Sequence, residues 1–223
     1  MIDIENGSII LVNKPYTWTS FQVVNKLKYH IKHKYGVKKF KIGHAGTLDP
    51  LATGLLIICI GKFTKRIEEF QAKEKEYTGV FRLGATTPCF DLEKPIDNEY
   101  PYIQITDDDI LRVANSFIGE IDQTPPLFSA VKVEGKRAYE LARENQEVEL
   151  KSKKIIISEF EVKNINLPDV EFRIVCSKGT YIRSIARDFG LALNSGAHLI
   201  ELERTRIGEF KLEDALNVNE FDS

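Results

Sequence analysis

The fold is decided by the loop Gly43-His-Ala-Gly-Thr-Leu-Asp-Pro-Leu-Ala-Thr-Gly54, which runs directly into the apolar stretch Leu55-Leu-Ile-Ile-Cys-Ile60. Three glycines and one proline among these twelve residues impose an unusual backbone path. The apolar stretch that follows is typical of a buried strand. Asp49 is the one acid in the loop, and it is therefore the first candidate for chemistry.

Two interpretations of Asp49 are open from residue types alone. The proline that follows it pushes its backbone toward an extended conformation, which would present the carboxylate from a loop. Asp before Pro is equally typical of a helix N-cap, in which case Asp49 only starts a helical turn. His44 is a satisfied loop histidine or a ring that stacks on a base. It has no second ligand at metal spacing, so a metal site is the use least expected of it.

Strand and helix signals alternate along the chain without a regular βαβ period. The expected strands are Ile9–Val12, Leu55–Ile60, Glu76–Leu83, Ile155–Val162 and Val170–Cys176. Helices are expected to begin at Thr19 or Ser20, at Thr106, at Lys136 (ending near Arg143) and at Thr180, with Gly119 and Gly190 closing the second and the last. This pattern predicts an α+β fold with a mixed, mainly antiparallel β-sheet flanked by helices.

Composition places the chain among ordinary soluble proteins. It has 223 residues, 43% hydrophobic and 29% charged, with a formal net charge of -2, which argues against disorder along its whole length. The longest apolar run is far too short to span a membrane, and no signal peptide opens the chain. The three cysteines form no CxxC pair, so we expect buried free thiols and a cytoplasmic protein.

Positive charge is concentrated in one stretch. Residues 26–41 carry seven lysines and no acid, which indicates a surface for phosphates despite the overall acidity. A second basic feature is the helix that carries Arg183 and Arg187 on one face, at the spacing i,i+4. Two such arginines most often form a solvated surface. No acid lies four residues from Arg183, however, so its partner is expected from elsewhere in the fold.

The loop resembles the catalytic motif of the TruB-type tRNA pseudouridine synthases. Further segments resemble that family's other motifs in the same order: Val12–Pro15, Lys75–Thr78, Pro125–Tyr139, Cys176–Arg183 and Gly196–Thr205. The resemblance runs from about Gly7 to Leu216. It implies a pseudouridine synthase catalytic fold with a central RNA-binding cleft, and isomerisation of uridine 55 in the T loop of tRNA after the base is flipped out.

The resemblance also implies site residues. Asp49 is the catalytic carboxylate, a nucleophile or an electrostatic partner, and Arg183 is its bidentate partner. Tyr77 stacks on the uracil and takes part in proton transfer. His44 fills the space that the flipped base leaves, and Tyr181 and Leu202 wall the pocket. The remaining residues assigned to substrate binding are Lys14, Lys26, Lys32 and Lys38.

We expect residues 1–223 to form a single catalytic domain, with an RNA-clasping insertion at about 124–150 and no full PUA domain. The expected enzyme is a monomer that acts on the T-arm stem-loop of tRNA with no cofactor, metal or required protein partner. Two rival functions are a guide-RNA-dependent synthase of the dyskerin type and a non-catalytic RNA-binding or chaperone protein. Activity on bare tRNA separates the first, whereas loss of Asp49, Tyr77 or Arg183 would have indicated the second.

Overall fold

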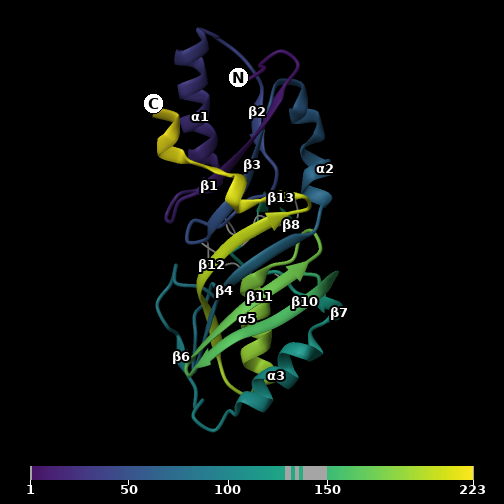
Figure 1. The fold of residues 1–223 in the computed structure, drawn as a ribbon. Coiled ribbons are helices and arrows are strands. Elements are labelled where there is room, and N and C mark those ends of the chain that lie inside the picture. The colour runs from purple at the N-terminus through teal and green to yellow at the C-terminus, as the bar shows by residue number, and fades with distance from the viewer. Residues whose placement is uncertain (1, 129–131, 134–135, 138–149, 223) are drawn as a thin grey trace. The chain divides into compact units, whose positions relative to one another are not determined.

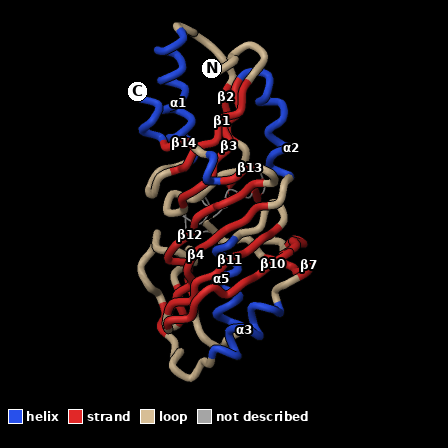
Figure 2. The backbone as a smooth tube through the Cα atoms, in the orientation of Figure 1, coloured by secondary structure: helices blue, strands red, loops and turns tan. Residues whose placement is uncertain are grey.

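A computed structural model describes residues 2–128, 132–133, 136–137 and 150–222 (Figures 1 and 2). The chain divides into two compact units, residues 1–78 with 202–223 and residues 79–201. Strands β4 (Lys75–Leu83) and β12 (Ala197–Ile207) contribute residues to both units. The pseudouridine synthase cleft implied by the resemblance stays a prediction.

The first unit is built on strands near the N-terminus and the C-terminus of the chain. Its strands follow the order β14-β1-β3-β12-β4, with β2 beside β3 and β13 beside β12. Pairing is antiparallel for β1 with β3, β2 with β3 and β12 with β13, and parallel for β1 with β14 and β3 with β12. The other elements of this unit are β1 (Ser8–Lys14), α1 (Ser20–Tyr35), β2 (Ile42–His44), β3 (Thr53–Ile60), η1 (Gly61–Arg66), α2 (Ile67–Ala72), β13 (Phe210–Lys211), η2 (Leu212–Asp214), β14 (Leu216–Asn217) and η3 (Val218–Asp222).

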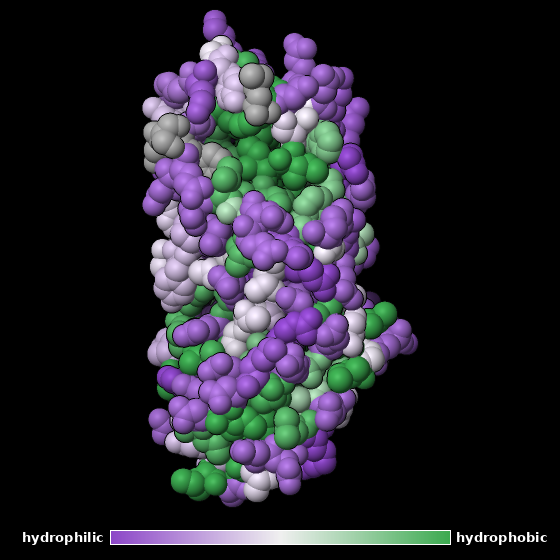
Figure 3. Space-filling view, viewed as in Figure 1, coloured by the Kyte–Doolittle hydropathy of each residue, from purple (hydrophilic) through white to green (hydrophobic). Residues whose placement is uncertain are grey.

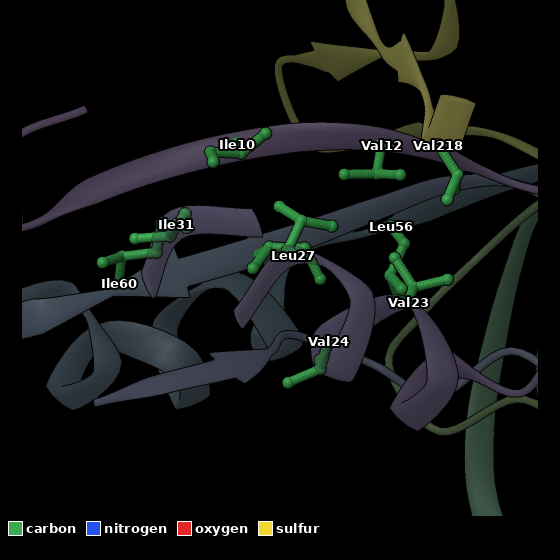
Figure 4. Close-up of a cluster of buried hydrophobic side chains, with 10 residues drawn as sticks. Ile10, Val12, Val23, Val24, Leu27, Ile31, Leu56, Ile60 and Val218 are labelled. Carbon is green, nitrogen blue, oxygen red and sulfur yellow. The ribbon is translucent and has the colours of Figure 1, made fainter. Parts of the chain in front are cut away.

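Strand β3 is apolar throughout because both of its faces are covered. Leu56, Ile58 and Ile60 pack with Val23, Val24, Leu27 and Ile31 of α1 and with Ile10 and Val12 of β1. Figure 4 shows Leu27 and Val23 of the helix directed toward Val12 and Leu56 of the strands. The alternate β3 residues, Leu55, Ile57 and Cys59, pack with Ala45, Phe70 of α2 and Ile207. A strand buried on both faces cannot show polar alternation, which explains the continuous run in the sequence.

Helix α1 begins where the sequence predicts. The Thr19 hydroxyl accepts a hydrogen bond from the Gln22 backbone N–H at 3.1 Å, and the Gln22 side chain accepts one from the Thr19 backbone N–H at 2.7 Å. This capping box satisfies two backbone donors that a helix start leaves unpaired. Gly36 ends the helix in the left-handed region, at φ 65°. The last turn carries Lys32, His33 and Lys34, and positive charge there stabilises the helix because the C-terminal end of the helix dipole is negative.

In the part that the structure describes, the second unit combines an antiparallel sheet with the helices α3 (Asp107–Ser116) and α5 (Ile182–Ala192) (Figure 1). Its strands follow the order β12-β4-β11-β10-β7, and β10 pairs antiparallel with both β11 and β7. Its core is aromatic: Phe81 stacks on Phe172 with ring centroids 4.0 Å apart, and Phe160 and Phe189 pack around them. The elements of this unit are β5 (Ala85–Thr86), β6 (Asn98–Glu99), α3 (Asp107–Ser116), β7 (Gly119–Gln123), β8 (Lys132–Val133), β9 (Lys136–Arg137), β10 (Lys153–Asn166), β11 (Asp169–Cys176) and α5 (Ile182–Ala192).

The predicted α+β class with a mixed, mainly antiparallel sheet is confirmed. Three predicted element ends were wrong. Gly119 does not close α3 but starts β7, and Gly190 lies inside α5, where an added Cβ would lie 2.4 Å from the Ala197 backbone nitrogen. Glycine is needed there for close packing and not for a helix end. The last helix begins at Ile182 with Tyr181 as N-cap, after Thr180.

The helix predicted from Lys136 to Arg143 was wrong at its start. Lys136 and Arg137 form β9, which pairs antiparallel with β8. Residues 138–143 lie outside the described residues, as does most of the expected insertion at 124–150.

The cysteine prediction is confirmed, because Cys59, Cys89 and Cys176 are free and buried. Burial raises the pKa of the Cys59 thiol to about 11, which makes it unreactive at neutral pH. Among the described residues, no helix has both the length and the apolar character needed to cross a membrane.

Candidate active site

Asp49 lies at the first position of a β-turn, between β2 and β3. The Ala52 backbone N–H donates to the Asp49 carbonyl oxygen at 3.1 Å, which closes the four-residue turn around Pro50. Proline suits the second position of such a turn because its φ is fixed near the required value. No helix begins at Asp49, so the N-cap interpretation was wrong. The carboxylate therefore belongs to a loop held between two paired strands.

Lys14 anchors this turn through a hydrogen bond to the backbone of Pro50. Its side chain is fully buried, and its ammonium donates to the carbonyl oxygens of Pro15, Trp18 and Pro50 at 3.0, 2.5 and 3.2 Å. Burial lowers the pKa of Lys14 to about 8, against the opposing attraction of Asp49. An ammonium whose three donors are all used inside the protein is suited to positioning the loop and not to holding a phosphate. The geometry thus favours a positioning role over the predicted substrate contact.

The first turn of α1 makes a second anchor. The Ser20 hydroxyl accepts from the Leu48 backbone N–H at 2.9 Å and donates to the Leu48 carbonyl oxygen at 3.3 Å. Both residues are buried, so the loss of either bond would leave a buried polar group unsatisfied, at a cost of roughly 1–3 kcal/mol. The residue directly before Asp49 is therefore tied to the helix start.

Arg204 clamps the two ends of the loop. Its guanidinium donates to the Leu55 carbonyl oxygen at 2.8 Å through Nε and to the Gly46 carbonyl oxygen at 3.1 Å through Nη2, with the side chain 1% exposed. Strand β12 brings it there by parallel pairing with β3, in which Arg204 is the partner of Gly54. An added Cβ at Gly54 would lie 2.4 Å from the Arg204 carbonyl oxygen, so only glycine fits. Arg204 lies in the segment Gly196–Thr205 that resembles a family motif, but nothing in the sequence alone indicates this clamping role.

His44 is held as an uncharged ring. Its Nδ1 atom is buried and has no hydrogen-bond partner among the described residues. Burial and then the positive charge of Arg204 lower the pKa of His44, so the imidazole is neutral at pH 7. A neutral ring stacks on bases without attracting phosphate.

The remaining predicted residues of the first unit lie on its strands, on α1 and just beyond the end of that helix. Tyr77 is buried on β4, 9% exposed, and Leu202 is half-buried on β12, where its carbonyl oxygen accepts from the Thr53 hydroxyl at 3.4 Å. Lys32 is exposed on α1, where Lys26 is partly exposed, and Lys38 is exposed beyond the helix end. The structure thus places Lys14, His44, Asp49, Tyr77 and Leu202 in one compact unit.

Arg183 and Tyr181 lie in the second unit, at the start of α5. Arg183 is 4% exposed and donates to the carbonyl oxygens of Cys89 and Phe128 at 3.1 and 3.0 Å, while its Nε lies 3.5 Å from Asp91 Oδ2. Arg183 is thus no solvated surface residue, and the expected long-range carboxylate is found in Asp91. The pairing with Asp49 implied by the resemblance stays a prediction.

Asp91 is the functional candidate that sequence reasoning missed. It is 4% exposed, and its Oδ1 accepts from the Glu93 backbone N–H at 3.0 Å while Oδ2 faces Arg183. The preceding residue, Phe90, has φ 62°, a strained value for a residue with a side chain. Strain beside a buried ion pair is a common mark of a functional site. No local sequence pattern around Asp91 could have predicted its pairing with Arg183, which lies 92 positions later in the chain.

Two further contacts steady the start of α5. The Gln123 amide donates to the Tyr181 carbonyl oxygen at 3.1 Å and accepts from the Tyr181 backbone N–H at 2.8 Å. The Lys153 ammonium lies 4.9 Å from the centre of the Tyr181 ring, a cation–π distance. Arg187, one turn beyond Arg183, is instead engaged by Asp188 at 2.7 Å and lies over Phe90.

The described residues include no group of three or more His, Cys, Asp or Glu side chains that could hold a metal. His198 is buried and its Nδ1 lies 2.9 Å from the Ala85 carbonyl oxygen, which makes it a structural histidine. A cavity of about 420 Å³ in the first unit is lined by Asn13, Lys14, Pro15, Trp18, Thr53, Glu203, Asn217, Val218 and Asn219. Asp49 is not among the residues that line it.

This chain is similar to known proteins in both its sequence and its fold. Residues 32–182 match the family described as TruB family pseudouridylate synthase (N terminal domain), and residues 183–223 match the tRNA pseudouridylate synthase B C-terminal domain. The tRNA pseudouridine synthase B of Phocaeicola vulgatus is 59% identical over 99% of this chain and 94% of its own length. The protein of the same name from Clostridium tetani is 44% identical over 97% of this chain and 73% of its own length.

A solved structure described as a Cbf5-Nop10-Gar1 complex contains a chain that is 32% identical, with a TM-score of 0.74. The match covers 98% of the present chain and 54% of that one. The chain belongs to the TruB family of pseudouridylate synthases.

Proposed function

We propose that this chain isomerises uridine 55 in the T loop of tRNA to pseudouridine, with Asp49 as the catalytic carboxylate. The observation that carries the proposal is the support of the Asp49 turn: three buried side chains, Lys14, Ser20 and Arg204, hold the loop on which the family's catalytic motif falls. A carboxylate held by such a scaffold is pre-organised for chemistry, because its position costs no reorganisation when the substrate arrives.

The reaction needs one ionised carboxylate and no added reagent. The N1–C1′ bond breaks, the uracil turns, and a C5–C1′ bond forms; the proton that leaves C5 balances the one that N1 gains. Asp49 acts beside C1′ or C6, as a nucleophile or as an electrostatic partner. No atom is lost and no electron is transferred to another molecule, so the proposal includes neither a redox cofactor nor a metal.

The other residues take supporting roles in the proposal. Arg183, oriented by Asp91 and two carbonyl oxygens, grips Asp49 with its planar fork. Tyr77 stacks on the uracil and takes part in proton transfer, while Tyr181 and Leu202 wall the pocket. The neutral His44 ring fills the space of the flipped base. We assign Lys14 to positioning of the turn.

RNA binding is proposed for the lysines of α1 and the segment after it, including Lys26, Lys32 and Lys38, and for the insertion at about 124–150. We further propose that residues 1–223 act as one catalytic domain, in the cytoplasm, as a monomer without a required protein partner. Light scattering of the purified chain, alone and with tRNA, tests the monomer.

The experiment is tritium release from C5-labelled uridine in an unmodified T-arm hairpin. The unsubstituted chain is expected to release tritium, and Asp49→Asn is expected to abolish release while the fold and RNA binding survive. Asp188→Asn, which changes an acid on α5 that pairs with Arg187, serves as the matched control and is expected to stay active. Near-normal turnover by a folded Asp49→Asn protein contradicts the assignment.

A guide-RNA-dependent activity is the second candidate, because the Cbf5 chain shares the fold at 32% identity. The 59% identity to a protein named tRNA pseudouridine synthase B favours the tRNA enzyme. Purified chain and bare tRNA separate the two. Activity that requires both a guide RNA and added proteins would favour the second candidate.

A further inference from the structure

Helix α1 presents an outward face with a single sign of charge. From Asn6 to Leu48 the sequence contains no aspartate or glutamate, and the helix has no acid in its first turn. Its inward face is taken up by packing against the strands, through Ser20, Val23, Val24, Leu27 and Ile31. In the space-filling view, hydrophilic residues in purple and pale shades cover the α1 side of the molecule (Figure 3). A face of this kind attracts a polyanion.

Two large rings stand on the same face. Phe21 is 65% exposed and Tyr29 67% exposed, although the helix already has a complete buried face. Eight residues separate them, which at 100° per residue leaves the two rings within one side of the helix. One turn farther, the His33 ring centroid lies 4.2 Å from that of Tyr29, at an interplanar angle of 48°. The neighbour limits the motion of the Tyr29 ring, so less entropy is lost when a ligand stacks on it.

Lysines are interleaved with these rings. Lys28 and Lys32 follow Phe21 by seven and eleven residues, spacings that return to the Phe21 side of a helix. Packing of the helix against the strands does not explain these rings, because they are exposed and lie between lysines. An apolar protein partner does not explain the lysines, because it would offer them no negative charge. A single-stranded nucleic acid matches both, since its bases stack on rings and its phosphates pair with cations.

We propose that the outward face of α1, made of Phe21, Lys28, Tyr29, Lys32 and His33, binds an unpaired stretch of the substrate RNA. Bases stack on Phe21 and Tyr29, and phosphates lie against Lys28 and Lys32. The proposal rests on the proposed function only in taking RNA as the partner. It assigns the recognition of bases, and not only of phosphate charge, to this helix.

The test is the Kd of an unmodified tRNA transcript, measured at several KCl concentrations. All proteins carry Asp49→Asn, so that binding is measured without turnover. Phe21→Ala with Tyr29→Ala is expected to weaken binding roughly 5- to 150-fold for each ring that stacks on a base, with the salt dependence unchanged. The ring-retaining pair Phe21→Tyr and Tyr29→Phe is expected to keep normal affinity. Leu191→Ala on α5, which removes a side chain of similar exposure, 63%, is the matched control.

Lys28→Gln with Lys32→Gln provides the contrasting result. Two lost phosphate contacts are expected to reduce the slope of log K against log salt by about 1.4. The proposal is overturned if the double alanine variant binds as the Leu191→Ala control does. It is also overturned if that variant flattens the salt slope, or if the ring-retaining pair binds as weakly as the alanine pair. A face that serves an acidic protein gives the first of these results.

Failure of this proposal is distinct from failure of the proposed function. Tritium release by the unsubstituted chain tests the isomerisation, and it does not depend on the Kd series. A chain that releases tritium from tRNA but shows no effect of the ring substitutions keeps its function and loses this surface.

Discussion

Replacing Lys14 with methionine removes a positive charge that the fold keeps away from water. The ammonium is fully buried, and burial lowers its pKa from 10.5 to about 8. At about 1.4 kcal/mol per pH unit, the charged lysine therefore costs the folded state about 3 kcal/mol relative to its neutral form. The loop carrying Asp49 thus rests on a group that is held at an energetic cost.

The sign of the pH dependence follows from the lowered pKa. Below about pH 8 the lysine is protonated in both the folded and the unfolded chain, so the whole cost is present. Between about pH 8 and pH 10.5 the unfolded chain holds a proton that the folded chain has lost, and stability rises with pH. Above the unfolded pKa the cost is gone. Methionine at this position has no such dependence.

The substitution also removes the ammonium donor from the carbonyl oxygens of Pro15, Trp18 and Pro50. The Pro15 oxygen still accepts from the Trp18 backbone N–H at 3.4 Å, so two of the three carbonyl oxygens lose the donor on which they depend. Two unsatisfied groups at roughly 1–3 kcal/mol each cost about 2–6 kcal/mol, and removal of the buried charge returns about 3 kcal/mol, so we expect the variant to be less stable at pH 7 by up to about 3 kcal/mol. The decisive quantity is the difference in the free energy of unfolding between the unsubstituted chain and the variant. This difference is expected to grow by about 3 kcal/mol from pH 7 to pH 10.5.

Urea unfolding at several pH values measures it, followed by the fluorescence of the single tryptophan, Trp18. Tyrosines and surface lysines titrate in both proteins, so their effects cancel in the difference. If the two free energies run parallel across this pH range, Lys14 is not held at a lowered pKa and the reasoning about its burial fails.

Four further outcomes are expected. Arg183→Lys should lower turnover strongly with RNA binding nearly unchanged, because lysine lacks the planar fork of arginine. Arg187→Lys on the same helix is the control and should stay active. A uniform loss of RNA affinity in the Arg183→Lys variant would instead place Arg183 on a phosphate. Gly54→Ala should destabilise the fold by more than the roughly 1–3 kcal/mol expected from backbone strain, since the added Cβ would lie 2.4 Å from the Arg204 carbonyl oxygen. Gly36→Ala is the control for strain alone, because Gly36 has a positive φ and no atom within 4 Å of an added Cβ. Equal losses of unfolding free energy in the two variants would exclude a clash at Gly54. Chelators should leave activity unchanged when magnesium is restored for RNA folding, and a strict need for added zinc would contradict this. A T-arm hairpin should match whole tRNA in kcat/KM, and a preference of about a hundredfold for tRNA, roughly 2.7 kcal/mol, would show contacts beyond the hairpin.

Local rules predicted the elements well wherever the signal was local. The capping boxes at Thr19 and Thr106 and the alternation of β10 and β11 each depend on residues within a few positions of one another. The wrong end predicted for α5 came from a glycine that serves close packing and not a helix end. Gly190 faces Ala197 and Gly54 faces Arg204, and neither partner can be recognised from the spacing of the glycines.

The candidate site divides in the same way. Asp49 could be chosen from the sequence because a lone acid in a glycine-rich loop before proline is a local feature, and its motif is familiar. The turn it occupies could not be chosen over a helix start, because both satisfy the same Asp-Pro pair. Asp91 was missed because its charge meets Arg183 only through pairing across the fold.

The sequence by itself determined the class of fold, the family resemblance and the candidate for the catalytic carboxylate, since each depends on residue types in order along the chain. Only the tertiary structure decided which polar groups are buried together. Lys14 and Arg204 look like ordinary strand cations in the sequence, yet the ammonium and the guanidinium are buried and donate hydrogen bonds to carbonyl oxygens. Burial is set by strands that pair across 150 residues, as Thr53 and Glu203 do, and desolvation then fixes what each charge can do.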